Sequence, residues 1–136
     1  MRVRTTFCWI LAVFMVFAGA NHFVAPATYD AMMPDVLPAH RALVYVSGVA
    51  EILGGLGLIL PATRKLAAWG LIALFLAVFP ANLNMAINGL PLGDNQLPSW
   101  ALWGRLPLQV VLIAWAYWFT REPATTVTAG PASSSS

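Results

Sequence analysis

The fold is set by an uninterrupted apolar stretch, ALVYVSGVAEILGGLGLIL, at residues 42–60. A helix rises ~1.5 Å per residue, so a stretch of this length approaches the ~30 Å thickness of a bilayer's hydrocarbon core. Its one charged residue, Glu51, lies at the centre, where an ionised side chain costs roughly 3 kcal/mol even on mild insertion scales. The stretch therefore predicts a membrane-spanning helix that turns Glu51 toward other helices.

Three further stretches of the same kind lie at about residues 5–23, 66–87 and 100–120. Of the 136 residues, 60% are hydrophobic and 9% are charged, which is more apolar than a soluble core requires. The sequence predicts an all-α fold, a bundle of four transmembrane helices forming one domain over residues 1–122. Residues 123–136 are rich in Thr, Ala, Gly, Pro and Ser and predict a disordered tail.

Charged residues divide between the two ends of this bundle. One end holds Arg2, Arg4, Arg64, Lys65, Arg121 and Glu122, and the other holds Asp30, Asp35, Arg41, Asp94 and Arg105. Because Lys and Arg concentrate in cytoplasmic loops, this predicts a multi-pass protein of the bacterial inner (plasma) membrane with both termini in the cytoplasm. The formal net charge is +2, but the basic residues are scattered, so the lipid bilayer and not nucleic acid is the expected partner.

The first stretch has an alternative interpretation as a secretory signal. Arg2 and Arg4 precede an apolar run that ends in Ala18-Gly19-Ala20, a pattern typical of a cleavage site. Cleavage there would leave three spans. We expect the stretch to be retained, because the resemblance described below places Asn21 and His22 in the first helix.

Small residues predict which helix faces pack, since lipid supplies no hydrophobic drive between helices. Two sets lie at helical spacing: Ser47, Ala50, Gly54 and Gly57 in one stretch, and Gly70, Ala73, Ala77 and Ala81 in the next. We expect both faces to lie in helix contacts. The lone cysteine, Cys8, predicts a small apolar filler of the core.

Between the first two spans, Pro26, Pro34 and Pro38 interrupt any long helix. The short segment between them contains Tyr29, Met32 and Met33. These residues predict a lid at the extracytoplasmic end of the bundle.

A polar residue occurs at similar depth in every span. Glu51 is accompanied by Arg105 and Gln109 on the fourth stretch, Asn82 on the third and His22 on the first. Polar groups at this depth must face the bundle interior, so the five residues predict one ligand pocket. Arg105 is the predicted ion-pair partner of Glu51, because its long side chain can cover the difference in depth.

The predicted pocket does not resemble a metal or nucleotide site. His22 and His40 are the only histidines, no Cys-x-x-Cys pair exists, and no glycine-rich phosphate loop is present. A mostly apolar pocket with a few polar groups suits a small amphipathic ligand. A quinone headgroup, which needs donors at its carbonyl oxygens, is one such ligand.

The sequence resembles the DoxX-like family of small bacterial membrane proteins. The resemblance lies in His22-Phe23, in SGVAEILGGLG at residues 47–57, in FPAN at residues 79–82 and in RLPLQ at residues 105–109. The family takes its name from a subunit associated with an archaeal thiosulfate:quinone oxidoreductase. It implies an accessory or ligand-binding role in quinone-linked redox processes, with other membrane redox proteins as partners, and it singles out the same five polar positions.

The sequence thus predicts a DoxX-like membrane protein with a polar intramembrane pocket and no stand-alone catalytic activity. Two alternatives stay open. One is a small proton-coupled transporter, an oligomer in which Glu51 exchanges a proton for its substrate. The other is a structural or assembly partner that binds no ligand, in which the polar cluster only fixes how the helices pack.

Overall fold

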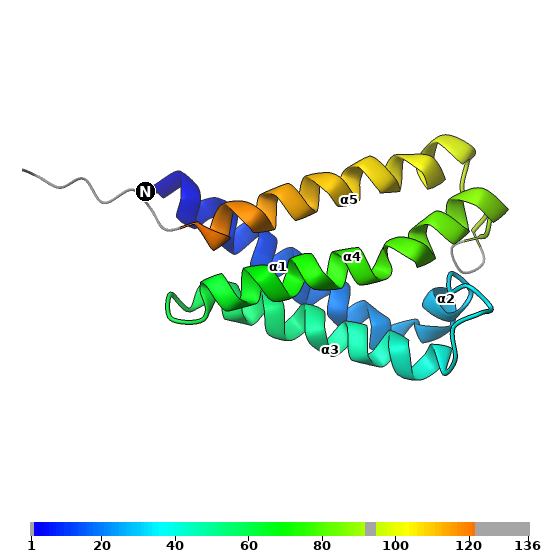
Figure 1. The fold of residues 1–136 in the computed structure, drawn as a ribbon, viewed down its shortest axis with the longest axis horizontal. Coiled ribbons are helices and arrows are strands. Elements are labelled where there is room, and N and C mark those ends of the chain that lie inside the picture. Colours follow the sequence, from blue (N-terminus) through cyan, green and yellow to red (C-terminus); the bar gives the residue numbers. More distant parts are fainter. Residues whose placement is uncertain (1, 92–94, 122–136) are drawn as a thin grey trace, which may run out of the picture.

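The chain is all-α in the part that the structure describes, residues 2–91 and 95–121 of a computed structural model. Its elements are α1 (Arg2–Val24), α2 (Pro26–Asp30), α3 (His40–Ile59), α4 (Arg64–Asn88) and α5 (Ser99–Thr120) (Figure 1). Three of these helices, α1, α3 and α4, are long and apolar enough to cross a membrane, and α5, with 22 residues, is not among them. The predicted disordered tail, residues 123–136, lies outside the described residues.

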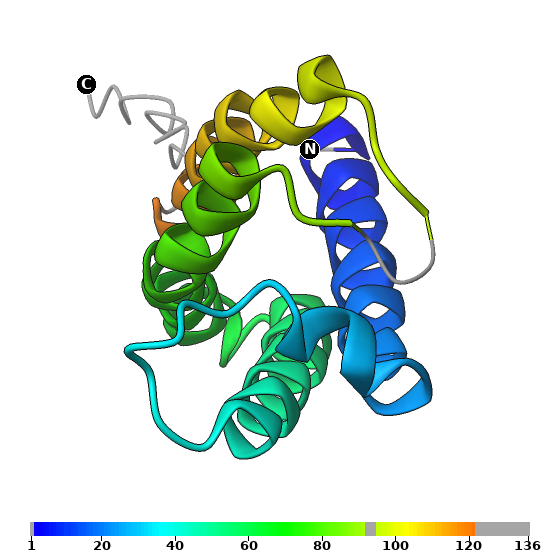
Figure 2. The same ribbon diagram turned by 90° about the vertical axis from the view of Figure 1, so that its right-hand side faces the viewer.

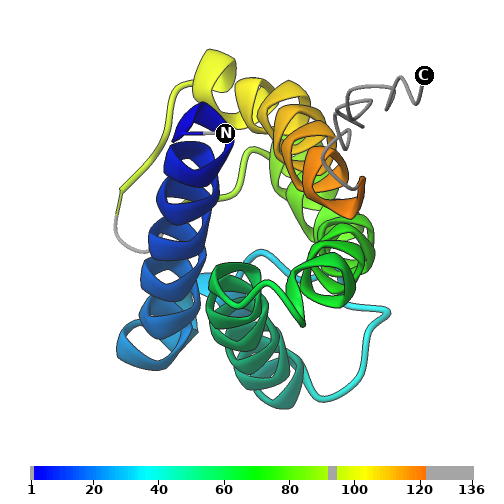
Figure 3. The same cartoon turned by 90° about the vertical axis from the view of Figure 1, so that its left-hand side faces the viewer.

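The four long helices surround a common axis (Figures 2 and 3). The helix α1 packs on α3, α3 on α4, and α4 on α5. The ring closes where α1 begins and α5 ends. There Phe7 packs edge-on against Trp115 at a centroid distance of 5.6 Å, and Arg4 donates to the backbone carbonyls of Trp118 and Arg121.

Glycines bring α1 and α3 into backbone contact. A Cβ added at Gly19 would lie 2.6 Å from the carbonyl oxygen of Gly48, and one added at Gly48 would lie 2.9 Å from that of Gly19. About two turns further along α3, a Cβ at Gly55 would lie 2.7 Å from the carbonyl oxygen of Ala12. No side chain fits at these three positions, so glycine sets the separation of the two helices.

Of the small-residue faces predicted from the sequence, the glycines of α3 lie in a helix contact, whereas three of the four residues on α4 do not. Gly54 and Gly57 of α3 face Leu71 and Ala67 of α4. On α4, however, Gly70, Ala73 and Ala77 are exposed, and a Cβ at Gly70 would meet nothing within 4 Å. The helix packs instead through a larger apolar set, Ala68, Leu71, Ile72 and Phe75. A row of small side chains permits close packing but does not require it.

A tight turn joins α3 to α4 as a hairpin. Arg64 donates from Nε to the carbonyl of Leu58 at 2.7 Å and from Nη2 to that of Ile59 at 3.2 Å. Thr63 donates its hydroxyl to the carbonyl of Gly57 at 2.9 Å. These bonds satisfy carbonyls that have no partner within α3 at its last turn.

Two apolar clusters fill the bundle at different heights. The larger lies toward the start of α1 and contains Cys8, Leu11, Ala12, Met15, Leu58, Ala68, Leu71, Ile72, Phe75, Ala116 and Phe119. Cys8 is buried there and donates its thiol to the carbonyl of Leu58, so it does fill the core. The smaller cluster, at the other end, contains Met32, Met85, Ala86 and Leu102.

We predict that Gly48→Ala destabilises the bundle by about 1–3 kcal/mol, because the new methyl group would overlap the Gly19 carbonyl and the Cβ of His22. Gly70→Ala is the matched control. It lies in an open helical position, so it should be neutral or stabilise by up to about 1 kcal/mol. Thermal unfolding in detergent measures both, and equal effects of the two substitutions would contradict the close contact between α1 and α3.

Candidate functional site

A cavity of about 300 Å³ opens inside the bundle. All five residues predicted as a ligand pocket line it: His22 from α1, Glu51 from α3, Asn82 from α4, and Arg105 and Gln109 from α5. The remaining wall is mostly apolar, with Met15, Val44, Phe75, Val78 and Leu112 among its residues. The fold therefore brings the five residues that the sequence places at a similar depth together around one space.

Glu51 contacts His22 and not Arg105, so the predicted ion pair is wrong. The distance from His22 Nε2 to Glu51 Oε2 is 3.3 Å, and the two residues are only 7% and 9% exposed. Glu51 Oε2 is nevertheless buried without a hydrogen-bond partner among the described residues, because the contact with His22 lacks hydrogen-bond geometry. The carboxylate is enclosed but only loosely held.

His22 is fixed by its other ring nitrogen. Nδ1 lies 2.9 Å from the backbone carbonyl of Val44, and a carbonyl can only accept, so Nδ1 carries a proton. The ring also lies against that of Tyr29, with centroids 3.9 Å apart. Gly48 sits between Val44 and Glu51 on α3, and the absence of its side chain lets His22 reach both residues.

Arg105 has no carboxylate partner in the described chain. Its contact is from Nη1 to the sulfur of Met85, at 3.3 Å, and a thioether is a weak acceptor. The guanidinium therefore faces the cavity with most of its five donors uncommitted. The prediction paired Arg105 with Glu51 because the two residues lie at similar depth. It failed because α5 lies across the bundle from the α3 face that carries Glu51.

Asn82 and Gln109 form a chain of hydrogen bonds between α4 and α5. Asn82 Nδ2 donates to Gln109 Oε1 at 2.7 Å, and Gln109 Nε2 donates to the carbonyl of Phe75. Pro80 leaves the carbonyl of Leu76 without its usual donor. Gln109 nevertheless uses the preceding carbonyl. These two amides hold α4 to α5 and leave Arg105 as the main free donor of the wall.

The segment after α1 covers the end of the cavity, where the sequence predicts a lid. Tyr29, Met32 and Met33 all line it. Asn21 donates to the hydroxyl of Tyr29 at 2.8 Å, and Asn84 donates to the carbonyl of Met32 at 3.1 Å. Both asparagines thus hold the lid in place.

Sequence reasoning missed one wall of the site. Phe14 and Ala18 of α1 line the cavity and also an apolar groove on the outer side of the same helix, with Trp9, Ile10, Val13 and Phe17. Aromatic residues on an apolar helix give no sign of this role, because lipid contact explains them equally well. The polar cavity and the apolar outer surface share these two residues as a boundary.

The described residues contain no group of three or more His, Cys, Asp or Glu side chains placed to hold a metal ion. The polar wall instead combines one cation, one loosely held carboxylate, an imidazole and two amides. Such a set can orient a ligand that has both a polar and an apolar part.

The architecture defines an all-α helical bundle with an internal polar cavity. A family model described as a domain of unknown function (DUF8561) matches residues 11–120, and the chain belongs to this family. No curated protein and no solved structure matches the chain.

The resemblance to the DoxX-like family is therefore wrong, because the family that matches is a different one. Glycines, prolines and a buried carboxylate recur in membrane bundles of many kinds, since close helix packing and interior polar groups favour them. The quinone-linked redox setting and the redox partners were implications of that resemblance and lose their basis with it.

We predict that His22 and Glu51 are energetically coupled. Glu51→Gln and His22→Asn should each reduce stability, and the double variant should recover part of the loss, with an interaction energy of about 0.5–3 kcal/mol. The same cycle for Glu51 and Arg105 serves as the comparison and should give a smaller value, because those side chains do not touch. A larger coupling to Arg105 than to His22, measured by unfolding in detergent, would refute the observed pairing.

Proposed function

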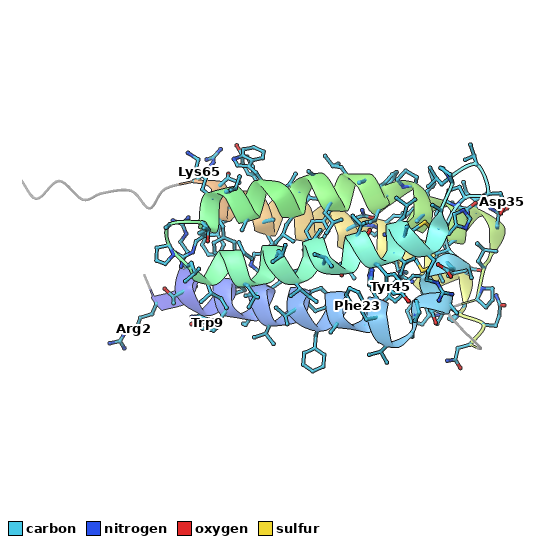
Figure 4. The ribbon with its side chains drawn as sticks, turned by 90° about the horizontal axis from the view of Figure 1, so that it is seen from below. Arg2, Trp9, Phe23, Asp35, Tyr45 and Lys65 are labelled. Atoms are coloured by element: carbon cyan, nitrogen blue, oxygen red, sulfur yellow. The ribbon has the colours of Figure 1, made fainter. Side chains whose placement is uncertain are left out.

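We propose that the chain crosses the membrane four times, with both termini in the cytoplasm. The helix α5 has 22 residues, enough for ~33 Å, and packs along α4. Its polar Arg105 and Gln109 face the cavity, so they lower its average apolarity without facing lipid. Arg2 and Lys65 lie at one end of the bundle and Asp35 at the other (Figure 4). This separation of charge favours the first end as cytoplasmic, in a bacterial inner membrane.

Reporter fusions test this topology. A reporter active only in the cytoplasm should give signal when fused after Arg121 and none when inserted after Val36, which is 86% exposed in the lid segment. If α5 did not cross the membrane, the fusion after Arg121 would be silent. A shortened amino terminus, detected by mass spectrometry of the purified protein, would identify α1 as a cleaved signal.

We propose further that the protein binds the polar end of a small amphipathic molecule in the cavity. The observation that carries this proposal is the presence, in one enclosed space, of a guanidinium without a carboxylate partner and a buried carboxylate oxygen without a hydrogen bond. Buried polar groups are normally satisfied, because each unsatisfied one costs about 1–3 kcal/mol or more. A bound ligand would supply both partners.

The boundary formed by Phe14 and Ala18 supports an amphipathic ligand. A cavity of about 300 Å³ lies at the lower end of the range of small-molecule sites. The apolar chain of a longer ligand must extend out of the cavity. Phe14 and Ala18 lead from the cavity to the apolar groove on the outer face of α1. In a bilayer this groove faces hydrocarbon, so the chain stays out of water.

A proton-coupled transporter is the second candidate function. Had Arg105 held Glu51 in an ion pair, the carboxylate could not have exchanged a proton freely. Glu51 instead contacts His22, at 3.3 Å and without a hydrogen bond. This looser contact favours proton exchange more than the ion pair with Arg105 that the sequence predicts. A purely structural or assembly role is the remaining alternative, and it requires no ligand.

Ligand binding is tested in lipid nanodiscs by thermal unfolding with a set of dodecyl compounds and a short-chain quinone. At a free concentration 100 times Kd, a ligand that binds only the folded protein stabilises it by about 2.7 kcal/mol. At least one compound should stabilise wild type, and the Kd of Arg105→Gln for that compound should be at least about tenfold higher. Arg41→Gln, which breaks an ion pair with Asp30 outside the cavity, is the matched control.

Stabilisation by a lipophilic cation that weakens on acidification would favour the transporter candidate. If no compound stabilises wild type and no small molecule is extracted from the protein purified with native lipids, the cavity is structural and the assembly role replaces both.

A further inference from the structure

Burial of the His22–Glu51 contact favours one proton on the pair. Nδ1 of His22 already donates to Val44, so Nε2 bears a lone pair unless the ring is an imidazolium. Nε2 lies 3.3 Å from Glu51 Oε2. Without a proton, an ionised carboxylate would be buried beside a neutral imidazole, with no hydrogen bond at Oε2, and that burial is costly. The proton lies on one residue or the other, and in either case the pair as a whole is neutral.

The cavity then carries a single uncompensated charge, that of Arg105. The titratable groups that line it are His22 from α1, Tyr29 from α2, Glu51 from α3 and Arg105 from α5, while the lining residues described on α4 include none. The hydroxyl of Tyr29 accepts from Asn21 and retains its own proton as a donor. With the pair protonated, the described lining has a net charge of about +1, and it offers donors at Arg105 and Tyr29.

A monoanion with two coplanar oxygens matches this lining best. A guanidinium pairs with a carboxylate through two parallel hydrogen bonds, and one negative charge neutralises Arg105. A phosphate monoester carries more charge than the cavity can balance. A cation would face Arg105 with like charge, and a neutral alcohol would leave the guanidinium unpaired.

Resting on the proposed ligand-binding function, we infer that the natural ligand is a single-chain amphiphile with a carboxylate headgroup, and that its binding retains one proton on the His22–Glu51 pair. The carboxylate accepts from Arg105, and its chain leaves over Phe14 and Ala18. Loss of the proton places a second carboxylate, that of Glu51, in the same enclosed space. Repulsion between the two then opposes binding, so ligand and proton bind cooperatively.

The experiment measures the Kd of dodecanoate from pH 6 to 9 for the full chain in nanodiscs of uncharged phospholipid, with empty nanodiscs subtracted. Dodecanol, dodecyltrimethylammonium and dodecyl phosphate serve as matched probes. Dodecanoate should bind most tightly, and its Kd should rise toward the upper end of the range by as much as about tenfold per pH unit, the limit for one linked proton. Calorimetry in two buffers of different ionisation enthalpy should show proton uptake on binding where the free pair is deprotonated.

Variants separate the two parts of the inference. Glu51→Gln cannot lose the proton and should bind dodecanoate with a Kd independent of pH. Arg105→Gln should weaken dodecanoate binding at least tenfold and bring it to the level of dodecanol, with Arg105→Lys between the two. Arg41→Gln should match wild type.

The inference fails if dodecanol, dodecyl phosphate or the cation binds as tightly as dodecanoate, or if the wild-type Kd is constant across the pH range. Both measurements use wild type, so a variant that does not fold leaves the test intact. Binding of another probe in place of dodecanoate would overturn this inference and leave the proposed ligand-binding function standing. Binding of none would overturn both.

Discussion

The backbone contact between α1 and α3 is the constraint on which the rest of the structure depends. Gly19, Gly48 and Gly55 leave no room for a side chain, so the two helices approach until carbonyl and Cα atoms touch. At this separation the ring of His22 lies over Gly48, bonds Val44 and reaches Glu51. A larger residue at position 48 would move α1 outward and separate the pair. The position of His22 beside Glu51 therefore depends on three positions that carry no side chain.

Beside this contact the bundle encloses a polar cavity. Two apolar clusters fill its ends, and α4 and α5 are tied together by Asn82, Gln109 and the carbonyl of Phe75. Between the two pairs of helices a polar space remains, with Arg105 and Glu51 facing it from α5 and α3. Inside a membrane such groups are costly unless they are satisfied, and a bundle that needed only structural rigidity would pair them directly. Their separation favours a site whose missing partner is a ligand.

The helices α4 and α5 show how an average over a sequence stretch misjudges a helix. Arg105 and Gln109 count against α5 as a span, although both line the interior cavity and its length of 22 residues suits one. The small residues of α4 mislead in another way, because they favour a packing face that does not form. Gly70, Ala73 and Ala77 suggest a packing face and instead lie exposed, because the larger apolar residues Leu71 and Phe75 fill the space against neighbouring helices. In both helices the direction in which a residue faces decides its role.

The sequence alone determined where the helices lie and how deep each polar residue sits. The predicted stretches agree with the bounds of the four long helices to within about three residues, and the five candidate residues do share one cavity. These properties follow from apolar run length and from the fixed rise of a helix. Only the tertiary structure decided that Glu51 meets His22 and that Arg105 stays free. The depth of a residue follows from its position along its own helix. Which residue it contacts depends on the order and rotation of the helices, and packing at the glycine contact decides these.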